Sequence, residues 1–444
     1  MVSKQRICLI SLGCAKNLVD SENVLGFLGQ EQFLIVGKPE DADIAIVNTC
    51  AFIQEAVKES IDTILELIEI KRSGKLKKVV VMGCFVQRYG YKLLREMPEV
   101  DVWLGTGNID RIVSVLRKEK TQEPHILIGR PGYLADHESP RVQTTPFYMA
   151  YLKIAEGCSN KCTYCTIPRL RGHLRSRAPD SIIAEAQQMA YRGVREINLV
   201  AQDTTMYGRD LGREQGLEDL LERLTRVPNI DWIRVLYAHP QRISERLLEL
   251  VTDDNSICPY LDLPLQHVSG KILEAMGREP AGESPWELIE RIRSGAGAIS
   301  LRTTLMVGFP GETEEDFHEL CEFVRTARFD HLGAFVFSPE PGTRAAKMKN
   351  CVERQVAQER LDKIMALQAE ISEKDNKVMI GQVVPVLIEG RSSETKLLLR
   401  GRTAGMAPEV DGQVLINKGQ ARVGEIARVL ITEAYAYDLV GEIL

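Results

Sequence analysis

The 444-residue sequence has no apolar run long enough to cross a membrane. One of its longest runs, at 79–86, falls far short of the ~18 apolar residues that a membrane helix needs. We therefore expect no transmembrane segment. The apolar part of the N-terminal MVSKQRICLISLGC is short and resembles a strand, so we expect no secretory signal and a cytoplasmic location.

The sequence also has no excess of positive charge. Lys and Arg number 56 against 62 Asp and Glu, a net charge of -6. Proteins whose main role is to bind a phosphate backbone normally present a basic face, so this balance argues against that class but allows a local basic patch. The hydrophobic content of 44% is that of an ordinary folded protein, and the length predicts about three domains.

No second CxxC pair accompanies the cysteine-rich stretch EGCSNKCTYCTIPRLRG at 156–172. A structural zinc site takes four ligands, and Cys158, Cys162 and Cys165 supply three. In a reducing compartment cysteines serve as metal ligands, catalytic thiols or small buried side chains. The spacing CxxxCxxC favours a loop that binds three irons of a cubane cluster and leaves the fourth iron open.

Three other cysteines follow predicted strands in the segment 1–118. The apolar runs 6–12, 43–48 and 78–83 are separated by helical patterns, which indicates a parallel sheet with helices on both faces. Cys14, Cys50 and Cys84 come directly after these runs. Each alone is typical of a small buried side chain. Because parallel strands end at one edge of a sheet, the topology predicts that the three thiols meet there.

The rest of the chain predicts a linker at 119–146 and two further domains. Residues 147–372 alternate six strand patterns with helices, which favours a partial parallel (βα) barrel, with an open doubly wound sheet as the alternative. A helix is predicted at 353–377. Residues 373–444 contain short strands separated by Gly, Asp and Asn, the pattern of a small antiparallel barrel.

The CxxxCxxC segment closely resembles the radical S-adenosylmethionine superfamily, and the order of the predicted domains resembles the methylthiotransferase family, with its C-terminal TRAM domain. The resemblance implies two 4Fe-4S clusters, one of which binds S-adenosylmethionine through its open iron and cleaves it to a 5′-deoxyadenosyl radical. The auxiliary cluster implied for the N-terminal domain takes part in sulfur delivery. A reductant such as flavodoxin or ferredoxin is implied as well. The implied site residues are Cys158, Cys162 and Cys165 for the first cluster, Cys14, Cys50 and Cys84 for the second, and Tyr164 for the cofactor.

Within that family, several stretches resemble the RimO branch. They are SLGCAKNLVDSE (11–22), IPRLRGHLRSR (167–177), AQDTTMYGRDL (201–211), LDLPLQHVSGKILEAMGR (261–278) and FSPEPGT (337–343). This resemblance implies insertion of a methylthio group at the β-carbon of an aspartate in the small-subunit ribosomal protein S-twelve. Ala15 departs from the proline that the family commonly has, but it flanks a ligand without being one.

Two other functions stay open at this point. The first is methylthiolation of adenosine in tRNA, which the charge of the C-terminal segment disfavours. Residues 372–444 hold ten acidic and nine basic side chains, whereas RNA-binding barrels rely on a basic groove. The second is a zinc-stabilised RNA-binding protein without catalysis, which the missing fourth ligands disfavour.

Other polar residues have two interpretations each. Arg169, Arg171, Arg175 and Arg177 form either a solvated face or a contact to substrate or cofactor, since arginine suits planar carboxylates. We interpret His267 as structural rather than active. VGFPGE at 307–312 is compatible with close approach to the adenosyl group and equally with an ordinary turn.

Overall fold

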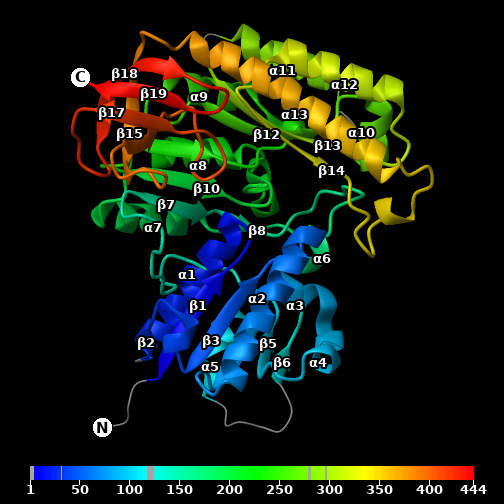
Figure 1. The fold of residues 1–444 in the computed structure, drawn as a ribbon, viewed down its shortest axis with the longest axis vertical. Coiled ribbons are helices and arrows are strands. Elements are labelled where there is room, and N and C mark those ends of the chain that lie inside the picture. The colour runs from blue at the N-terminus through cyan, green and yellow to red at the C-terminus, as the bar shows by residue number, and fades with distance from the viewer. Residues whose placement is uncertain (1–4, 32, 118–124, 279–281, 296–297) are drawn as a thin grey trace.

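The computed structural model describes residues 5–31, 33–117, 125–278, 282–295 and 298–444. Figure 1 shows three parts. The N-terminal part, in blue and cyan, lies below; the central part, in green and yellow, lies above it; a small red barrel at the C-terminus lies beside the central part. No helix among the described residues combines the length and apolar character needed to cross a bilayer.

The N-terminal part is a six-stranded parallel sheet in the order β2-β1-β3-β4-β5-β6. Its strands are β1 (Arg6–Ser11), β2 (Leu34–Ile35), β3 (Ile44–Thr49), β4 (Lys78–Gly83), β5 (Val102–Leu104) and β6 (His125–Leu127). Its helices are α1 (Ala15–Gln30), α2 (Gln54–Arg72), α3 (Cys84–Tyr89), α4 (Leu93–Glu96) and α5 (Ile112–Leu116). The predicted parallel sheet is confirmed. β6 lies inside the segment interpreted as a linker and pairs with β5.

Both faces of this sheet are buried, which explains the continuous apolar runs. Val47 and Val81 face the side covered by α2, α3 and α4. Ile46 and Val80 face the side covered by α1 and α5. The sheet is therefore a layer between two groups of helices. This leaves the edge formed by the carboxyl ends of its strands to carry functional side chains.

The central part is a partial barrel of six parallel strands. Three-stranded sheets β11-β10-β7 and β12-β13-β14 are joined by a bridge between Ile233 and Ile257. The strands are β7 (Met149–Lys153), β10 (Glu196–Val200), β11 (Trp232–Val235), β12 (Tyr260–Gln266), β13 (Ser300–Val307) and β14 (His331–Val336), and a short pair is formed by β8 (Ala155–Glu156) and β9 (Arg175–Ser176). The expected α/β partial barrel is confirmed.

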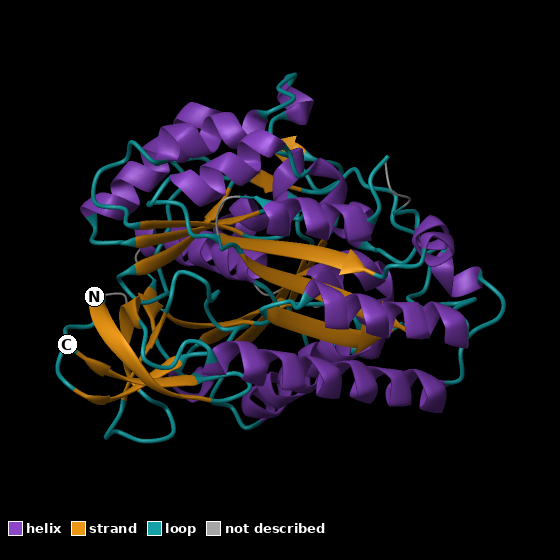
Figure 2. Ribbon diagram, turned by 90° about the horizontal axis from the view of Figure 1, so that it is seen from above, coloured by secondary structure: helices purple, strands orange, loops and turns teal. Residues whose placement is uncertain are grey.

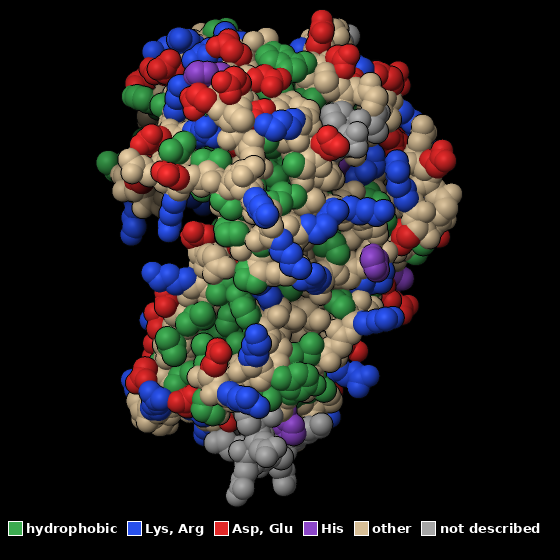
Figure 3. Space-filling model, turned by 90° about the vertical axis from the view of Figure 1, so that its right-hand side faces the viewer, with side chains coloured by type: hydrophobic (Ala, Val, Ile, Leu, Met, Phe, Trp, Pro, Cys, Tyr) green, Lys and Arg blue, Asp and Glu red, His purple; other side chains and the backbone are tan. Residues whose placement is uncertain are grey.

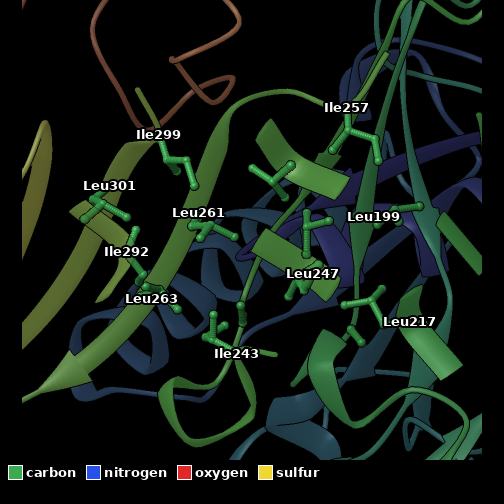
Figure 4. Close-up of a cluster of buried hydrophobic side chains, with 14 of the residues drawn as sticks. Leu199, Leu217, Ile243, Leu247, Ile257, Leu261, Leu263, Ile292, Ile299 and Leu301 are labelled. Atoms are coloured by element: carbon green, nitrogen blue, oxygen red, sulfur yellow. The ribbon is translucent and has the colours of Figure 1, made fainter. Parts of the chain in front are cut away.

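Helices surround these strands on the outside (Figure 2). They are α7 (Pro179–Tyr191), α8 (Gly216–Leu224), α9 (Glu245–Asp253), α10 (Gly270–Met276), α11 (Pro285–Ser294), α12 (Glu314–Ala327) and α13 (Arg354–Lys377), whereas α6 (Ile167–Arg171) packs against α3 of the N-terminal part. Apolar side chains of strands and helices interlock between the two layers, as Leu199, Leu247 and Leu261 do in Figure 4. This core leaves the opposite side chains of each strand to line the inside of the barrel.

The C-terminal part is a closed five-stranded barrel in the order β15-β16-β17-β19-β18. Its strands are β15 (Val383–Arg391), β16 (Leu399–Arg402), β17 (Val414–Lys418), β18 (Ile426–Ala434) and β19 (Leu439–Ile443). The predicted small barrel is confirmed, with one difference: β17 and β19 pair in parallel, whereas the other pairs are antiparallel.

Candidate functional site: two groups of cysteines between the domains

The three N-terminal cysteines lie at the carboxyl edge of the parallel sheet. Cys14 precedes α1, Cys50 follows β3, and Cys84 begins α3 directly after β4. Gly13 has φ +88°, and a Cβ there would lie 2.7 Å from the Cβ of Cys50 and 3.0 Å from its Sγ. Only glycine allows the loop before Cys14 to approach Cys50 this closely. The structure thus brings these thiols together.

Burial and neighbouring cations act in opposite directions on the thiols of this first group. Desolvation raises the pKa of Cys84 to about 11, an effect that Arg171 opposes and the neighbouring thiols Cys50 and Cys14 reinforce. At Cys14 desolvation also acts to raise the pKa, but Lys16, Arg171 and backbone N–H groups outweigh it, so the pKa of this thiol is lowered. The surroundings therefore favour a thiolate at Cys14.

The second group occupies the loop between β8 and α6. Gly157 begins this loop with φ +80°, and a Cβ there would lie 2.1 Å from the carbonyl oxygen of His173. The N–H of Cys158 donates to Gly172 O at 3.0 Å, and the N–H of Ile167 donates to the Sγ of Cys165 at 3.5 Å. These contacts fix the path of the loop between β8 and α6.

Burial raises the pKa of Cys158 to about 11 and that of Cys165 to about 12, and the charge of Cys162 contributes to both shifts. Arg278 donates to the Sγ of Cys162 at 3.8 Å. Tyr164 packs against the apolar cluster that contains Met276. Three sulfurs therefore converge in this loop, one buried and two partly exposed, with one arginine close to them.

Arg171, the last residue of α6, connects the two groups. Its Nη1 lies 2.5 Å from the Oδ2 of Asp20 and 3.4 Å from the Oε2 of Glu156, and its Nη2 donates to the Oδ1 of Asn17. Lys153 pairs with the same two carboxylates, at 2.9 Å from Glu156. The guanidinium also opposes the rise in the pKa of the Cys84 thiol. A buried ion-pair network thus joins α1 of the N-terminal part to β7, β8 and α6 of the central part.

Lys16 makes a second contact between the parts. Its ammonium lies 3.4 Å from the centre of the Tyr237 ring. Tyr237 follows β11 at the mouth of the barrel and has φ +59°, an uncommon conformation for a residue with a side chain. The first turn of α1 therefore reaches from Cys14 to the barrel mouth.

The structure decides between several interpretations that the sequence left open. Arg169 is exposed, whereas Arg171 and Arg177 are buried in ion pairs, Arg177 with Glu185 at 2.6 Å. Arg175 donates to backbone carbonyl groups. His267 is fully buried, accepts the N–H of Ser269 at Nδ1, and has its pKa lowered to about 4 by desolvation, which agrees with a structural role.

The stretch 307–312 forms a turn. Gly308 and Gly311 have φ +73° and +88°, and the N–H of Phe309 donates to Glu312 at 3.1 Å. The interface residues Lys16, Asp20 and Lys153 were not singled out by the sequence analysis. The sequence could have predicted a buried ion pair at Lys153, because a charged residue inside an apolar strand pattern needs a buried partner.

The donor sets fit iron-sulfur clusters in their chemistry. Each group consists of cysteine sulfurs, the usual ligands of such clusters, and each offers three of them. Among the residues described by the structure, no group of three or more His, Cys, Asp or Glu side chains has an arrangement for a single metal ion. The residues that could hold clusters are the two groups of thiols described above.

Three family models match the chain. The Uncharacterized protein family UPF0004 matches residues 6–105, the Radical SAM superfamily matches 152–324, and the TRAM domain matches 380–444. Among curated proteins, the chain is 48% identical over 442 residues to the ribosomal protein uS12 methylthiotransferase RimO of Geotalea uraniireducens, covering 99% of each chain. It is 48% identical over 444 residues to the protein of the same name from Geobacter sulfurreducens, covering 100% of this chain and 99% of the other.

Among solved structures, the fold is similar to the radical S-adenosylmethionine methyltransferase TsrM from Kitasatospora setae, which has cobalamin and a 4Fe-4S cluster bound. The TM-score is 0.54 at 14% identity, over 75% of this chain and 72% of that one. The cobalamin-dependent radical enzyme OxsB gives a TM-score of 0.50 at 14% identity, over 84% of this chain and 56% of the other. At this identity the likeness concerns the fold alone.

Proposed function

Because the chain belongs to the RimO family of ribosomal protein uS12 methylthiotransferases, we propose that it inserts a methylthio group at the β-carbon of an aspartate of uS12, the small-subunit protein S-twelve. The observation that carries the proposal is the 48% identity to a RimO protein over 99% of both chains. A tRNA adenosine methylthiotransferase would show the same radical domain, but the two relatives described above carry the uS12 name.

The proposal assigns two 4Fe-4S clusters and S-adenosylmethionine to the chain. Cys158, Cys162 and Cys165 would hold one cluster, with Tyr164 beside the cofactor. Cys14, Cys50 and Cys84 would hold the other. When bound, the first cluster supplies the electron that cleaves S-adenosylmethionine. The gathering of three thiols at each place, at the carboxyl edge of a parallel sheet and at the mouth of a barrel, supports this assignment.

Residues around the two groups of cysteines would affect the reduction potential and the charge of the clusters. Arg278 and the N–H of Ile167 donate hydrogen bonds to Cys162 and Cys165, and hydrogen bonds to cluster sulfurs raise the reduction potential. Cys158 is buried, whereas Cys162 and Cys165 are partly exposed. At the other group, Arg171 supplies positive charge next to Cys84.

The proposal divides the chain into a cluster domain (1–118), a linker (119–146), a radical domain (147–372) and a TRAM-like barrel (373–444). The near-neutral barrel suits a basic ribosomal protein as partner better than RNA does. Buried ion pairs hold the barrel on the radical domain, among them Arg402 with Glu196 at 2.7 Å. Radical chemistry also needs a one-electron donor, for which we propose a flavodoxin or a ferredoxin.

The test offers two substrates in parallel. Anaerobically reconstituted enzyme is incubated with reductant, sulfide and S-adenosylmethionine, together with small ribosomal subunits in one reaction and bulk tRNA in the other. Mass spectrometry should find a methylthio increment on an aspartyl peptide of uS12. The same increment on a tRNA nucleoside alone would overturn the substrate assignment and leave the chemistry standing.

A further inference from the structure

A group of exposed cations surrounds the loop that carries Cys158, Cys162 and Cys165. The members of this basic patch are Lys161, Arg169, Arg344, Lys347 and Lys349. Within the part of the chain that the structure describes, none of them forms an ion pair with Asp or Glu, whereas other exposed arginines such as Arg72 and Arg325 do. In a chain with a net charge of -6, the patch is thus a local region of uncompensated positive charge.

Contacts between the cysteine loop and the segment after β14 bring the members of the basic patch together. The Nη2 of Arg344 donates to Lys161 O at 2.5 Å. A Cβ on Gly342 would lie 2.1 Å from the Nη1 of Arg169, so this guanidinium lies against the backbone of the same segment. Lys347 ends the short 3-10 helix that begins directly after Arg344. Segments that are far apart in the sequence therefore form one surface.

The basic patch lies where the cysteine loop reaches solvent. Cys162 and Cys165 are partly exposed, and Lys161 directly precedes Cys162 in the chain. Arg169 lies on α6, the helix that follows the loop. Figure 3 shows Lys and Arg side chains grouped across the middle of the face that lies at the right in Figure 1, where the segment after β14 runs. A protein bound to the patch would therefore lie next to the cluster that this loop holds.

The charge of the basic patch indicates an acidic partner. Exposed carboxylates flank it at Glu274 on α10 and at Glu353 directly before α13, but no carboxylate pairs with its members among the described residues. Complementary charges steer two proteins together, and complexes between electron-transfer proteins are small, so a few charges suffice to orient them. Phosphates of RNA would also be attracted. Binding RNA does not require closeness to a cluster, however, whereas electron transfer does, because its rate falls steeply with distance.

We propose that the basic patch binds an acidic one-electron donor protein and brings its redox group next to the loop of Cys158, Cys162 and Cys165. This inference rests on the proposed function and deepens it, because it gives the flavodoxin or ferredoxin a binding surface. In the complex, one electron leaves the donor, which is oxidised, and enters the cluster held by the loop, which is reduced. No bond breaks and no proton moves. Because the patch acts through exposed charges, its effect weakens as the ionic strength rises.

The test compares a charge-reversed patch with a matched control. The patch variant, Lys347→Glu with Lys349→Glu, changes two members that lie away from the cysteines in the sequence. The control, Lys75→Glu with Lys374→Glu, makes the same change in net charge at exposed positions outside the patch. Reconstituted enzyme is titrated calorimetrically with an acidic flavodoxin and, separately, with an acidic ferredoxin. At low salt the patch variant should bind the donor about 10-fold more weakly than wild type does, and the control should bind like wild type. High salt should reduce the difference.

The rate of cluster reduction separates docking from damage to the cluster. In stopped-flow absorbance, the reduced donor should reduce the patch variant about 10-fold more slowly than wild type at low salt. Dithionite, a small reductant that needs no docking surface, should reduce wild type and both variants at the same rate.

Three results would overturn the inference. The first is equal affinity of wild type and the patch variant for the donor, and the second is that neither donor binds wild type. The third is weaker binding of the patch variant to small ribosomal subunits with unchanged donor binding, which would assign the patch to ribosomal RNA. Failure of the proposed function itself looks different: wild-type enzyme reduced by dithionite would then leave native uS12 unmodified.

Discussion

At the scale of single residues, buried polar groups keep one protonation state because their partners and the loss of water fix it. His267 is an example: it is fully buried and accepts a backbone hydrogen bond, so desolvation lowers its pKa from 6.5 to about 4. Glu156, in contrast, is buried beside Lys153 and Arg171, which hold its pKa at about 2. Both groups link folding to pH.

The pH dependence of the free energy of unfolding tests the protonation state of His267. In the unfolded chain His267 binds a proton below about pH 6.5, whereas the folded chain binds it only near pH 4. Stability should thus fall as the pH falls through 6.5, by about 2 kcal/mol from this group between pH 7.5 and pH 5. Denaturant unfolding of wild type and His267→Asn should show this difference in slope. His318→Asn, at an exposed position on α12, should keep the wild-type slope; an equal slope in His267→Asn would refute the account.

At the scale of elements, the local pattern of the sequence predicted most strands and helices because apolar periodicity and turn residues act within a few positions. The strand runs that end at Cys14, Cys50 and Cys84 placed these residues on one sheet edge by topology alone. β6 was missed because a strand of three residues is too short to show an apolar periodicity. The parallel pairing of β17 with β19 was also missed, because it depends on how the barrel closes.

Gly157 sets the backbone conformation at the start of the loop that carries Cys158, Cys162 and Cys165. Gly157→Ala would place a methyl group 2.1 Å from the carbonyl oxygen of His173 and should displace the loop. We expect the purified variant to lose about half of its iron while keeping the cluster at Cys14, Cys50 and Cys84. Gly74→Ala is the matched control, since Gly74 has a similar φ of +82° and nothing within 4 Å of the added methyl. Iron content equal to wild type in Gly157→Ala would contradict this.

At the scale of the whole molecule, buried ion pairs fix the position of one domain on another. Besides the network at Arg171, Arg88 of the N-terminal part pairs with Glu340 of the central part at 2.5 Å, and Arg141 of the linker pairs with Glu22 of the N-terminal part at 2.6 Å. These partners are more than 100 positions apart in the chain. No local pattern predicts them, nor the contact of Lys16 with Tyr237, because they exist only after the domains dock.

Removing the guanidinium of Arg171 should lower the free energy of unfolding. Arg171→Met leaves the buried carboxylates of Asp20 and Glu156 short of a partner, which should lower the free energy of unfolding by about 3 to 5 kcal/mol. Arg169→Met, two residues earlier on the same helix but exposed, should change it by less than about 0.5 kcal/mol. Denaturant titration of both variants checks this; similar midpoints would show that the network does not join the domains.

The central claim is that two separate groups of cysteines perform two different parts of one reaction. The most direct measurement follows 5′-deoxyadenosine and methylthiolated uS12 side by side in wild type, Cys162→Ser and Cys50→Ser. We expect Cys162→Ser to form neither product, and Cys50→Ser to keep forming 5′-deoxyadenosine while uS12 stays unmodified. Unimpaired methylthiolation by either variant would contradict the account.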